Sequence, residues 1–434
     1  MYLGLDLGTT NVKALVVDDC GHIVSEGTAP VERIHTPEGG VEQNIEQIWD
    51  QTCAAIRSAV TGIDATAIQA IGVSSQGAAL QWLDGDGQPI GPIISWLDGR
   101  GRTFDDKITE ELGEDFFADH IGRCRATMAV GQILRLREQS PELFSRPKQI
   151  GFVGDVIVGR LCGRRAHDPT SLSIAALLNP SLGRADPQVL AHLGINEDEL
   201  PELVPVQHAA GRLKVETADC TGLSEGIPVS AAIHDQYAAV LGSGSVSDGD
   251  VSLGTGTAWV LVANTGQLSR PITPETFVCP HPVPGLYGQL LSMVNGGSAL
   301  DWAGKLIGRN NLSGEEIDAV LQTVPPGSDG LCFWPLLSPG GPQGTSESGG
   351  RLSGITLRHT SRHLLRAVLE GLGCELTRHL GFFTQAGFSV QRLVMTGSPA
   401  ASHPRYSLTS AACPWCVSRS RPSAHTERRS SPAR

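Results

Sequence analysis

The chain has 434 residues, of which 40% are hydrophobic and 18% charged, and its formal net charge is −12. The length suggests two domains, and the acidic balance argues against binding to nucleic acid or to an anionic membrane surface. No hydrophobic run reaches the roughly 18 residues of a membrane span, and the N-terminal residues lack the basic start of a signal peptide. The ten scattered cysteines favour a reduced cytoplasm over a disulfide framework. We therefore expect a cytoplasmic protein with no nucleic-acid partner and no membrane partner.

The first half of the chain begins with strands and glycine turns. Residues 1–6 and 11–17 alternate in hydrophobicity around a Gly-Thr-Thr turn, and the turn at 18–21 leads into a third strand. The other elements expected in this half are a helix at 44–60, a strand at 67–74, short strands at 80–83 and 90–96, helices at 130–138 and 153–161, and a loop-rich connector at 200–229.

The second half repeats the opening pattern. A strand at 249–253 ends in Gly-Thr-Gly-Thr, and another strand at 258–263 leaves this turn. The recurrence of strand, Gly/Thr turn and strand predicts two similar halves that face each other. The further elements expected are helices at 298–306, 314–323 and 361–382, and a strand at 390–396 that ends at Gly397.

The first candidate site is the segment GLDLGTTNVK, residues 4–13. Asp6 ends a strand, and Gly8, Thr9 and Thr10 form the turn that follows. A carboxylate in this position can hold a hydrated Mg²⁺, and the N–H groups and hydroxyls of the turn can reach phosphate oxygens. The alternative is a plain hairpin in which Asp6 only caps the turn.

The second candidate site is the segment SLGTGTAW, residues 252–259. Its turn offers amide and hydroxyl donors to an anion. The pattern is common in loops and carries weight only as the partner of the first turn. The residues of this turn are Gly254, Thr255, Gly256 and Thr257.

The third candidate site is the segment AIHDQYAAVLGSG, residues 232–244. A strand ends at His234, and a helix of small residues follows Asp235. An ionised aspartate there can take the proton from an attacking sugar hydroxyl. The alternative is that Asp235 serves as the helix N-cap, and His234 is expected to be a packed histidine at the strand end.

The fourth candidate site lies within residues 74–101. Gln76, Trp96, Asp98 and Arg100 stand at strand ends, where such side chains can bind sugar hydroxyls and Trp96 can stack on an apolar sugar face. The alternative is a surface hairpin with a salt bridge between Asp98 and Arg100.

Taken in order, these motifs resemble the FGGY family of carbohydrate kinases, within the actin-like ATPase superfamily, over about residues 1–400. The resemblance implies an α/β fold of two ribonuclease-H-like domains facing a central cleft, with ATP and Mg²⁺ as cofactors. It implies an N-terminal domain at 1–240 that holds the sugar, the phosphates and Mg²⁺. The C-terminal domain, at 241–400, would hold the nucleotide and be truncated at its C-terminal end. A small sugar and ATP are the expected partners, with a homodimer as the expected assembly.

The resemblance also assigns roles to single residues. It implies that Asp235 is the catalytic base and that Asp6 holds Mg²⁺. In the segment LVMTGSPAAS the loop that closes over adenosine usually has two glycines, and this chain has Gly397 followed by Ser398. The implied phosphate and nucleotide contacts are Gly8, Thr9, Thr10, Lys13, Gly254, Thr255, Gly256, Thr257, Gly397 and Ser398. The implied sugar contacts are Gln76, Gly77, Trp96, Asp98, Arg100, Asp235 and Gln236.

The segments SSQGAAL, WLDGR and HDPTSLS look most like xylulokinases. We therefore expect ATP-dependent phosphorylation of a pentulose such as D-xylulose, giving the sugar 5-phosphate in carbohydrate catabolism. Xylulokinases commonly have Gln-Met-His where this chain has Gln76-Gly77-Ala78, so glycerol, gluconate or another ketose stay open as substrates. Two rivals are a non-catalytic remnant that binds sugar or nucleotide, and an actin-like assembly or chaperone ATPase.

The tail departs from the family pattern. Residues 403–434 lack the helix, the GLPV-type strand and the small-residue helix that close the adenine pocket, and they should be disordered. Shifted by one base, codons for GLPVVC read as ACPWCV, and codons for GAAVLAR read as ERRSSPA, and both appear here in order. We infer a frame slip near residues 399–403, so the Cys413/Cys416 pair is no redox or zinc motif. The aberrant tail at 401–434 makes the activity of this chain doubtful, with weak ATP binding expected.

Overall fold

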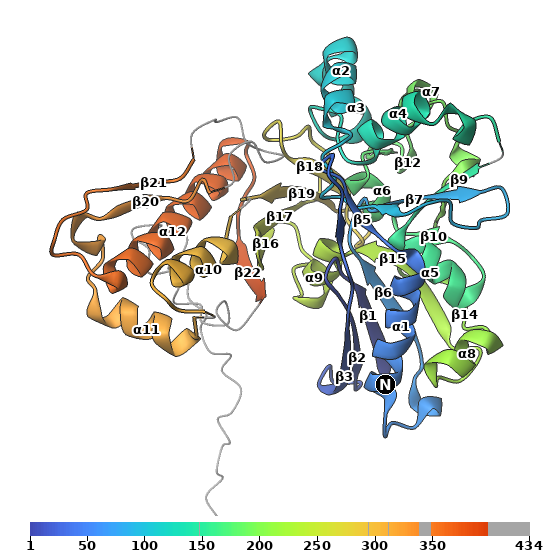
Figure 1. Ribbon diagram of the computed structural model, residues 1–434, viewed down its shortest axis with the longest axis horizontal. Coiled ribbons are helices and arrows are strands. Elements are labelled where there is room, and N and C mark those ends of the chain that lie inside the picture. Colours follow the sequence, from blue (N-terminus) through green and yellow to red (C-terminus); the bar gives the residue numbers. More distant parts are fainter. Residues whose placement is uncertain (147, 294, 311, 338–348, 398–434) are drawn as a thin grey trace, which may run out of the picture. The chain divides into compact units, whose positions relative to one another are not determined.

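The computed structural model describes residues 1–146, 148–293, 295–310, 312–337 and 349–397 (Figure 1). This part of the chain divides into two compact units. The first unit contains residues 1–254, 260–292 and 382–396, and the second contains 255–259, 293–381 and Gly397. Ser398 and the predicted aberrant tail, with Cys413 and Cys416, lie outside the described residues.

The first unit is built on a mixed sheet with the strand order β13-β10-β15-β6-β1-β2-β3, and β14 pairs with β15. β1 pairs with β2 in an antiparallel hairpin and runs parallel to β6, which runs parallel to β15. The carboxyl ends of these parallel strands meet at one edge, where α/β proteins commonly bind ligands. The strands are β1 (Tyr2–Leu7), β2 (Asn11–Val17), β3 (Ile23–Pro30), β6 (Ile71–Ser75), β10 (Ala166–His167), β13 (Glu202–Leu203), β14 (Ala209–Arg212) and β15 (Pro228–His234).

Helices pack on this sheet through hydrophobic faces. In α1 (Ile45–Val60), Asn44 caps the first turn, and Ile48 and Ile56 are buried against the sheet. The alternate residues Leu3, Leu5 and Leu7 of β1 point into the same core, as expected of a strand with one face on it. The other helices on this sheet are α5 (Val153–Cys162), α8 (Val215–Thr221) and α9 (Asp235–Gly242) (Figure 1).

The expected connector at 200–229 is not simply a loop. It contains β13, β14 and the helix α8. These elements are too short to show a hydrophobic period in the sequence. β13 pairs with the distant strand β10, whereas β14 pairs with β15, which begins at Pro228.

A second sheet of the first unit has the order β4-β5-β8-β7-β9. Its strands are β4 (Ile34–His35), β5 (Val41–Gln43), β8 (Ile93–Ile94), β7 (Leu80–Asp84) and β9 (Lys148–Phe152). The neighbouring elements are α2 (Arg102–Leu112), α3 (Glu114–Ile121), α4 (Ala129–Gln139), α6 (Pro169–Ile174) and α7 (Pro187–Leu193), with the short pair β11 (Leu178–Asn179) and β12 (Arg184–Ala185).

A third sheet contains the second Gly/Thr turn. Its order is β18-β19-β17-β16-β22, so the strands on either side of the turn are neighbours. The predicted recurrence of strand, turn and strand is thus confirmed. The strands are β16 (Asp250–Thr255), β17 (Trp259–Thr265), β18 (Phe277–Pro280), β19 (Tyr287–Ser292) and β22 (Arg392–Gly397).

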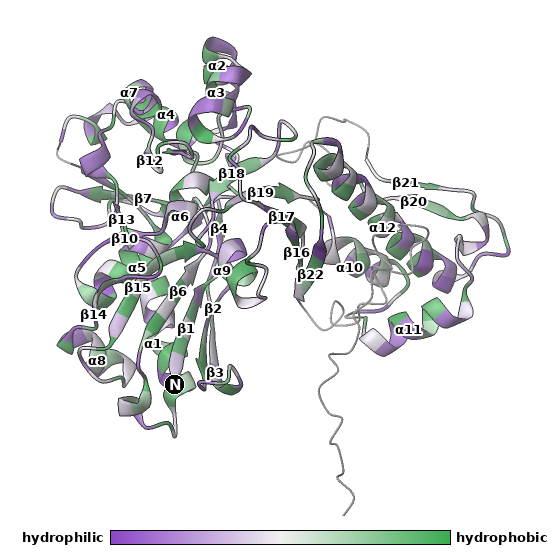
Figure 2. Cartoon of the chain, turned by 180° about the vertical axis from the view of Figure 1, so that it is seen from behind, coloured by the Kyte–Doolittle hydropathy of each residue, from purple (hydrophilic) through white to green (hydrophobic). Residues whose placement is uncertain are grey.

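The second unit is mainly helical. It contains α10 (Gly297–Leu306), α11 (Gly314–Thr323), most of α12 (Ser361–Gln385) and the hairpin of β20 (Cys332–Trp334) and β21 (Arg351–Ser353). α12 carries hydrophobic and hydrophilic residues (Figure 2), and its buried leucines recur every three or four residues. Within the described residues, no helix combines the length and the apolar character needed to cross a membrane.

Candidate active site

The parallel strands of the first sheet bring two acidic residues together. Asp6 stands near the end of β1, and Asp235 directly follows β15. Burial raises the pKa of the Asp6 carboxyl, and the negative charge of Asp235 raises it further. The Ser74 hydroxyl opposes this shift by donating to Asp6 Oδ1 at 3.1 Å. Two neighbouring carboxylates form a donor set that suits a divalent cation.

Asp235 is held by the residue before it. Nε2 of His234 lies 3.3 Å from Oδ1 of Asp235, and the side chains are 8% and 37% exposed. Burial lowers the pKa of His234, although the negative charge of Asp235 opposes this shift, and the neutral imidazole is therefore favoured. The arrangement leaves Asp235 open to solvent while His234 is buried.

Two predictions are decided at this position. His234 is the N-cap of α9 and Asp235 is the first residue of the helix, so the N-cap reading of Asp235 is wrong. The cap site needs an extended backbone, and His234 has it because it ends β15. The prediction that His234 is a packed residue at a strand end is confirmed by its 6% exposure.

Gly77 lies against the ring of His234. A Cβ atom at Gly77 would stand 2.6 Å from Cδ2 of His234 and 2.7 Å from Cγ2 of Ile174. Any larger residue must therefore displace the imidazole. Nδ1 of His234 is buried and has no hydrogen-bond partner among the residues that the structure describes.

The first Gly/Thr turn is tied to the strand ends by side chains. The Thr9 hydroxyl donates to Gln76 Oε1 at 3.1 Å and accepts from the Trp96 indole N–H at 3.0 Å. The structure thus brings together three residues that the sequence predicted separately. Sequence reasoning missed a fourth, Gln43, which donates to the Thr9 carbonyl and accepts from Gln76, each at 3.0 Å.

The other residues of the first turn have local contacts. Gly8 makes a close backbone approach, because a Cβ there would lie 2.8 Å from the Asn11 carbonyl oxygen. The Thr10 hydroxyl accepts a hydrogen bond from the side-chain Nδ2 of Asn11 at 3.2 Å. Lys13 stands opposite Asp6 in the hairpin register, and its charge counteracts the rise in the pKa of Asp6.

Asp98 and Arg100 pair with each other, as the alternative reading predicted, but they do so inside the unit. Arg100 Nη2 lies 2.6 Å from both Asp98 and Glu42. Asp98 is 7% exposed. Burial acts to raise the pKa of Asp98, but the hydrogen bonds from Arg100 outweigh this effect, and the pKa is lowered. Asp98 also accepts from the Val41 amide and from Gln132. The prediction that the Asp98–Arg100 salt bridge lies at the surface is therefore wrong. The pair stabilises the segment around Trp96.

Gln236 and Gly254 lie together in the first unit. A Cβ at Gly254 would stand 3.2 Å from Oε1 of Gln236, so the helix that starts at Asp235 approaches the end of β16. The boundary between the two units falls directly after Gly254.

In the second unit, the second turn is supported through its backbone. The carbonyl oxygens of Gly256 and Thr257 accept from the first two amides of α10, each at 3.0 Å. Gly397 approaches Thr255 closely, because a Cβ there would lie 2.4 Å from its hydroxyl and 3.1 Å from its amide nitrogen. Its φ of 137° is one that side-chain-bearing residues rarely adopt. Thr255, Gly256, Thr257 and Gly397 are thus brought together, whereas Ser398 lies outside the described residues.

Comparison with known proteins agrees with this arrangement. The profile of the FGGY family of carbohydrate kinases, N-terminal domain, matches residues 1–242. Xylulose kinase of Lactococcus lactis is 28% identical over 377 residues, which cover 85% of this chain and 74% of that protein. The structure of xylulose kinase from Rhodospirillum rubrum is similar, with a TM-score of 0.81, 24% identity and coverage of 95% of this chain and 88% of that one. Plasmodium falciparum glycerol kinase with ADP gives a TM-score of 0.84 at 19% identity, over 94% of this chain and 84% of that one.

These likenesses confirm the expected α/β fold. The family match covers more than half of the chain. The chain belongs to the FGGY family of carbohydrate kinases, phosphotransferases that act on alcohol groups.

Proposed function

We propose that this kinase transfers the γ-phosphoryl group of ATP to a hydroxyl of a pentulose such as D-xylulose, giving the sugar 5-phosphate in carbohydrate catabolism. The observation that carries the proposal is the partly exposed carboxylate of Asp235, held by His234 beside the charge of Asp6. The likeness to proteins named xylulose kinase supports the choice of sugar.

In the proposed reaction Asp235 accepts the proton of the attacking hydroxyl as the phosphoryl group transfers in line. His234 donates its Nε2–H toward the Asp235 carboxylate and fixes its orientation. Asp6 would hold Mg²⁺, with Ser74 as its hydrogen-bonding neighbour, and the ion would offset phosphate charge. Backbone amides and hydroxyls around Gly8, Thr9 and Thr10 contact the phosphates, and Lys13 adds a positive charge nearby.

Sugar recognition is assigned to the polar strand ends of the first unit. Gln76 is 4% exposed and already oriented by Thr9 and Gln43. Trp96, which is 42% exposed, offers its ring to an apolar sugar face. The remaining residues that we propose to shape or contact the sugar site are Gly77, Asp98, Arg100 and Gln236.

Nucleotide binding is assigned to the second turn. Gly254, Thr255, Gly256 and Thr257 would contact the γ-phosphate region, and Gly397 with Ser398 would approach adenosine. The close approach of Gly397 to Thr255 supports this assignment. The family match to residues 1–242 supports a division into domains at 1–240 and 241–400.

Another FGGY substrate is the alternative, and a specific observation favours it. The space beside Gly77 is filled by the His234 ring, where xylulokinases commonly carry Met-His after the glutamine. Glycerol, gluconate or a different ketose would meet a pocket of changed shape. A remnant that binds sugar without turnover is the non-enzymatic alternative.

The test is an assay of ADP release with D-xylulose, glycerol and gluconate, with mass spectrometry of the product. We expect ADP release to require the sugar, with kcat/KM for D-xylulose at least about tenfold above that for glycerol. A higher kcat/KM for another sugar would replace the proposed substrate. Sugar binding without ADP release would overturn the kinase assignment for this chain.

A cytoplasmic location and a homodimer stay predictions. Size-exclusion chromatography with light scattering at several protein concentrations would test the assembly. A constant mass of one chain would contradict the homodimer.

A further inference from the structure

Two cysteines from distant parts of the chain meet on the first unit. Cys53 lies on α1 and Cys220 on α8, and their sulfur atoms are 3.0 Å apart. This separation is only about 1 Å longer than an S–S bond of roughly 2.0 Å. Both cysteines are present as free thiols. We propose that Cys53 and Cys220 form a reversible dithiol–disulfide site that low-molecular-weight disulfides such as oxidised glutathione oxidise.

The two thiols are held in this position from both helices. The Cys220 thiol donates to the Thr217 carbonyl at 3.3 Å, which leaves the sulfur lone pairs free to face Cys53. Arg57, one turn after Cys53 on α1, donates to the Cys220 carbonyl oxygen. The contact between the sulfur atoms is therefore part of a wider attachment of α1 to α8.

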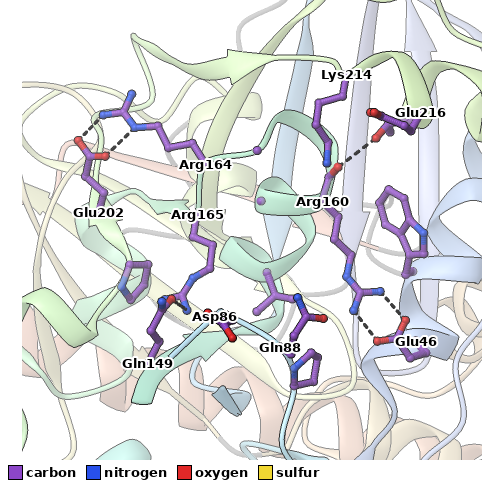
Figure 3. Close-up of a pocket in the computed structure, with 18 of the residues that line it drawn as sticks. Glu46, Asp86, Gln88, Gln149, Arg160, Arg164, Arg165, Glu202, Lys214 and Glu216 are labelled. Atoms are coloured by element: carbon purple, nitrogen blue, oxygen red, sulfur yellow. Dashed lines mark hydrogen bonds and ion pairs between the residues drawn. The ribbon is translucent and has the colours of Figure 1, made fainter. Parts of the chain in front are cut away.

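A pocket borders one of the two cysteines. Cys220 is one of the residues that line a cavity of about 900 Å³ in the first unit. Figure 3 shows charged side chains that line the same cavity. Its wall carries cations and carboxylates: Arg160 and Glu46 form an ion pair with each other, and Lys214 and Glu216 line the same cavity (Figure 3). Glutathione presents carboxylates and an ammonium group, so a pocket with charges of both signs suits it, and the volume is within the range of small-ligand sites.

The two cysteines differ in exposure, and this sets the order of reaction. Cys53 is 4% exposed, whereas Cys220 is half-buried at the pocket wall. Burial raises the pKa of the Cys53 thiol to about 12, and the neighbouring Cys220 adds to the shift. Because thiolates are the attacking species, Cys220 reacts first and Cys53 resolves the product.

The chemistry balances as two thiol–disulfide exchanges. The Cys220 thiolate attacks one sulfur of oxidised glutathione, forms a mixed disulfide and releases one glutathione thiolate. Cys53 then loses its proton to water and attacks the Cys220 sulfur, which releases the second glutathione thiolate. Both protein thiols are oxidised, and one glutathione disulfide is reduced to two glutathione molecules by two electrons.

The experiment treats the full chain with oxidised glutathione, blocks free thiols by alkylation and maps the peptides by mass spectrometry. We expect a peptide pair joined through Cys53 and Cys220, 2 Da lighter than the sum of the reduced peptides, which dithiothreitol separates. The disulfide closes a long loop, so the oxidised protein should melt on the order of 5 °C higher. This readout does not depend on kinase activity, so its result tests the disulfide proposal independently of the proposed function.

Variants make the assignment specific. Cys53→Ser should stop at the mixed disulfide on Cys220, and Cys220→Ser should leave Cys53 alkylated as a free thiol. Cys20→Ser, which removes an exposed cysteine of the β2–β3 turn, should still form the crosslink. Full alkylation of Cys53 and Cys220 in the oxidant-treated wild-type chain would overturn the proposal, as would a mixed disulfide on Cys220 that never resolves.

Discussion

The two Gly/Thr turns of this kinase are similar in sequence and are supported in different ways. The first turn has side-chain support in addition to the backbone bond from the Gly8 amide to the Asn11 carbonyl, since the Thr9 hydroxyl contacts both Gln76 and Trp96. In the second turn, the carbonyl oxygens of Gly256 and Thr257 accept from the amides of α10. Side-chain support links the first turn to the residues assigned to the sugar. Backbone support makes the second turn depend on small residues that allow close approach.

The largest effect that separates the two turns is expected at Asp6. Asp6→Asn removes the charge beside the first turn and keeps the size and the contact with Ser74. We expect kcat to fall by about 100-fold or more, because the charge that would hold Mg²⁺ is lost, and the Mg²⁺ concentration for half-maximal rate to rise. Steady-state ADP release over a Mg²⁺ titration measures both. Unchanged kcat and Mg²⁺ dependence would remove Asp6 from the site.

The second-largest loss of activity is expected on substitution of Gly77, which lies near the first turn. Gly77→Ala places a Cβ 2.6 Å from the His234 ring, so the ring and its contact with Asp235 must shift. We expect kcat/KM for the sugar to fall by about 10-fold or more, with a lower melting temperature. Gly72→Ala on β6 is the matched control, because its Cβ would meet no atom within 4 Å. Equal effects of the two substitutions would contradict the role given to His234.

The second turn is tested at Gly397. Gly397→Ala adds a Cβ that would lie 2.4 Å from the Thr255 hydroxyl, at a φ that disfavours alanine. Strain of about 1–3 kcal/mol should raise the KM for ATP by roughly tenfold while the KM for the sugar changes little. Gly349→Ala, where the Cβ would meet open space, should leave both values unchanged. A rise in the KM for the sugar alone would contradict the assignment of the second turn to the nucleotide.

The smallest effect compares neighbouring threonines of the first turn. Thr9→Val removes the hydroxyl shared by Gln76 and Trp96 and leaves the buried Gln76 oxygen without this donor, so kcat/KM for the sugar should fall about 5- to 10-fold. Thr10→Val removes only the contact with Asn11 and should change kcat/KM less than about twofold. Steady-state kinetics with D-xylulose or the best sugar found checks both variants. If Thr10 proves the more sensitive residue, side-chain support by Thr9 is not what positions the sugar site.

Sequence reasoning found the local parts of this site and missed the long-range ones. Both turns and the strand that leads to Asp235 follow from residues close together in the chain, because glycine turns and strand alternation are local signals. Gln43 was missed because its partners lie far away in the sequence and meet it only when the two sheets assemble. The contact between Cys53 and Cys220 spans 167 residues and has no local pattern at all.

The Asp98–Arg100 pair shows a second limit. The sequence predicted the salt bridge from proximity alone, but placed it at the surface. Its burial depends on Glu42 and Gln132, which come from other segments and satisfy the charged groups inside the unit. A local pattern gives the pairing, whereas the fold decides whether water surrounds it.

The central claim is that Asp235 is the proton acceptor of a sugar kinase. The most direct measurement compares wild-type protein and Asp235→Asn for sugar binding by calorimetry and for sugar-dependent ADP release. The account predicts similar binding of D-xylulose by both proteins and a fall in kcat of about 1000-fold or more in the variant. Turnover by Asp235→Asn within about tenfold of the wild-type rate would contradict it.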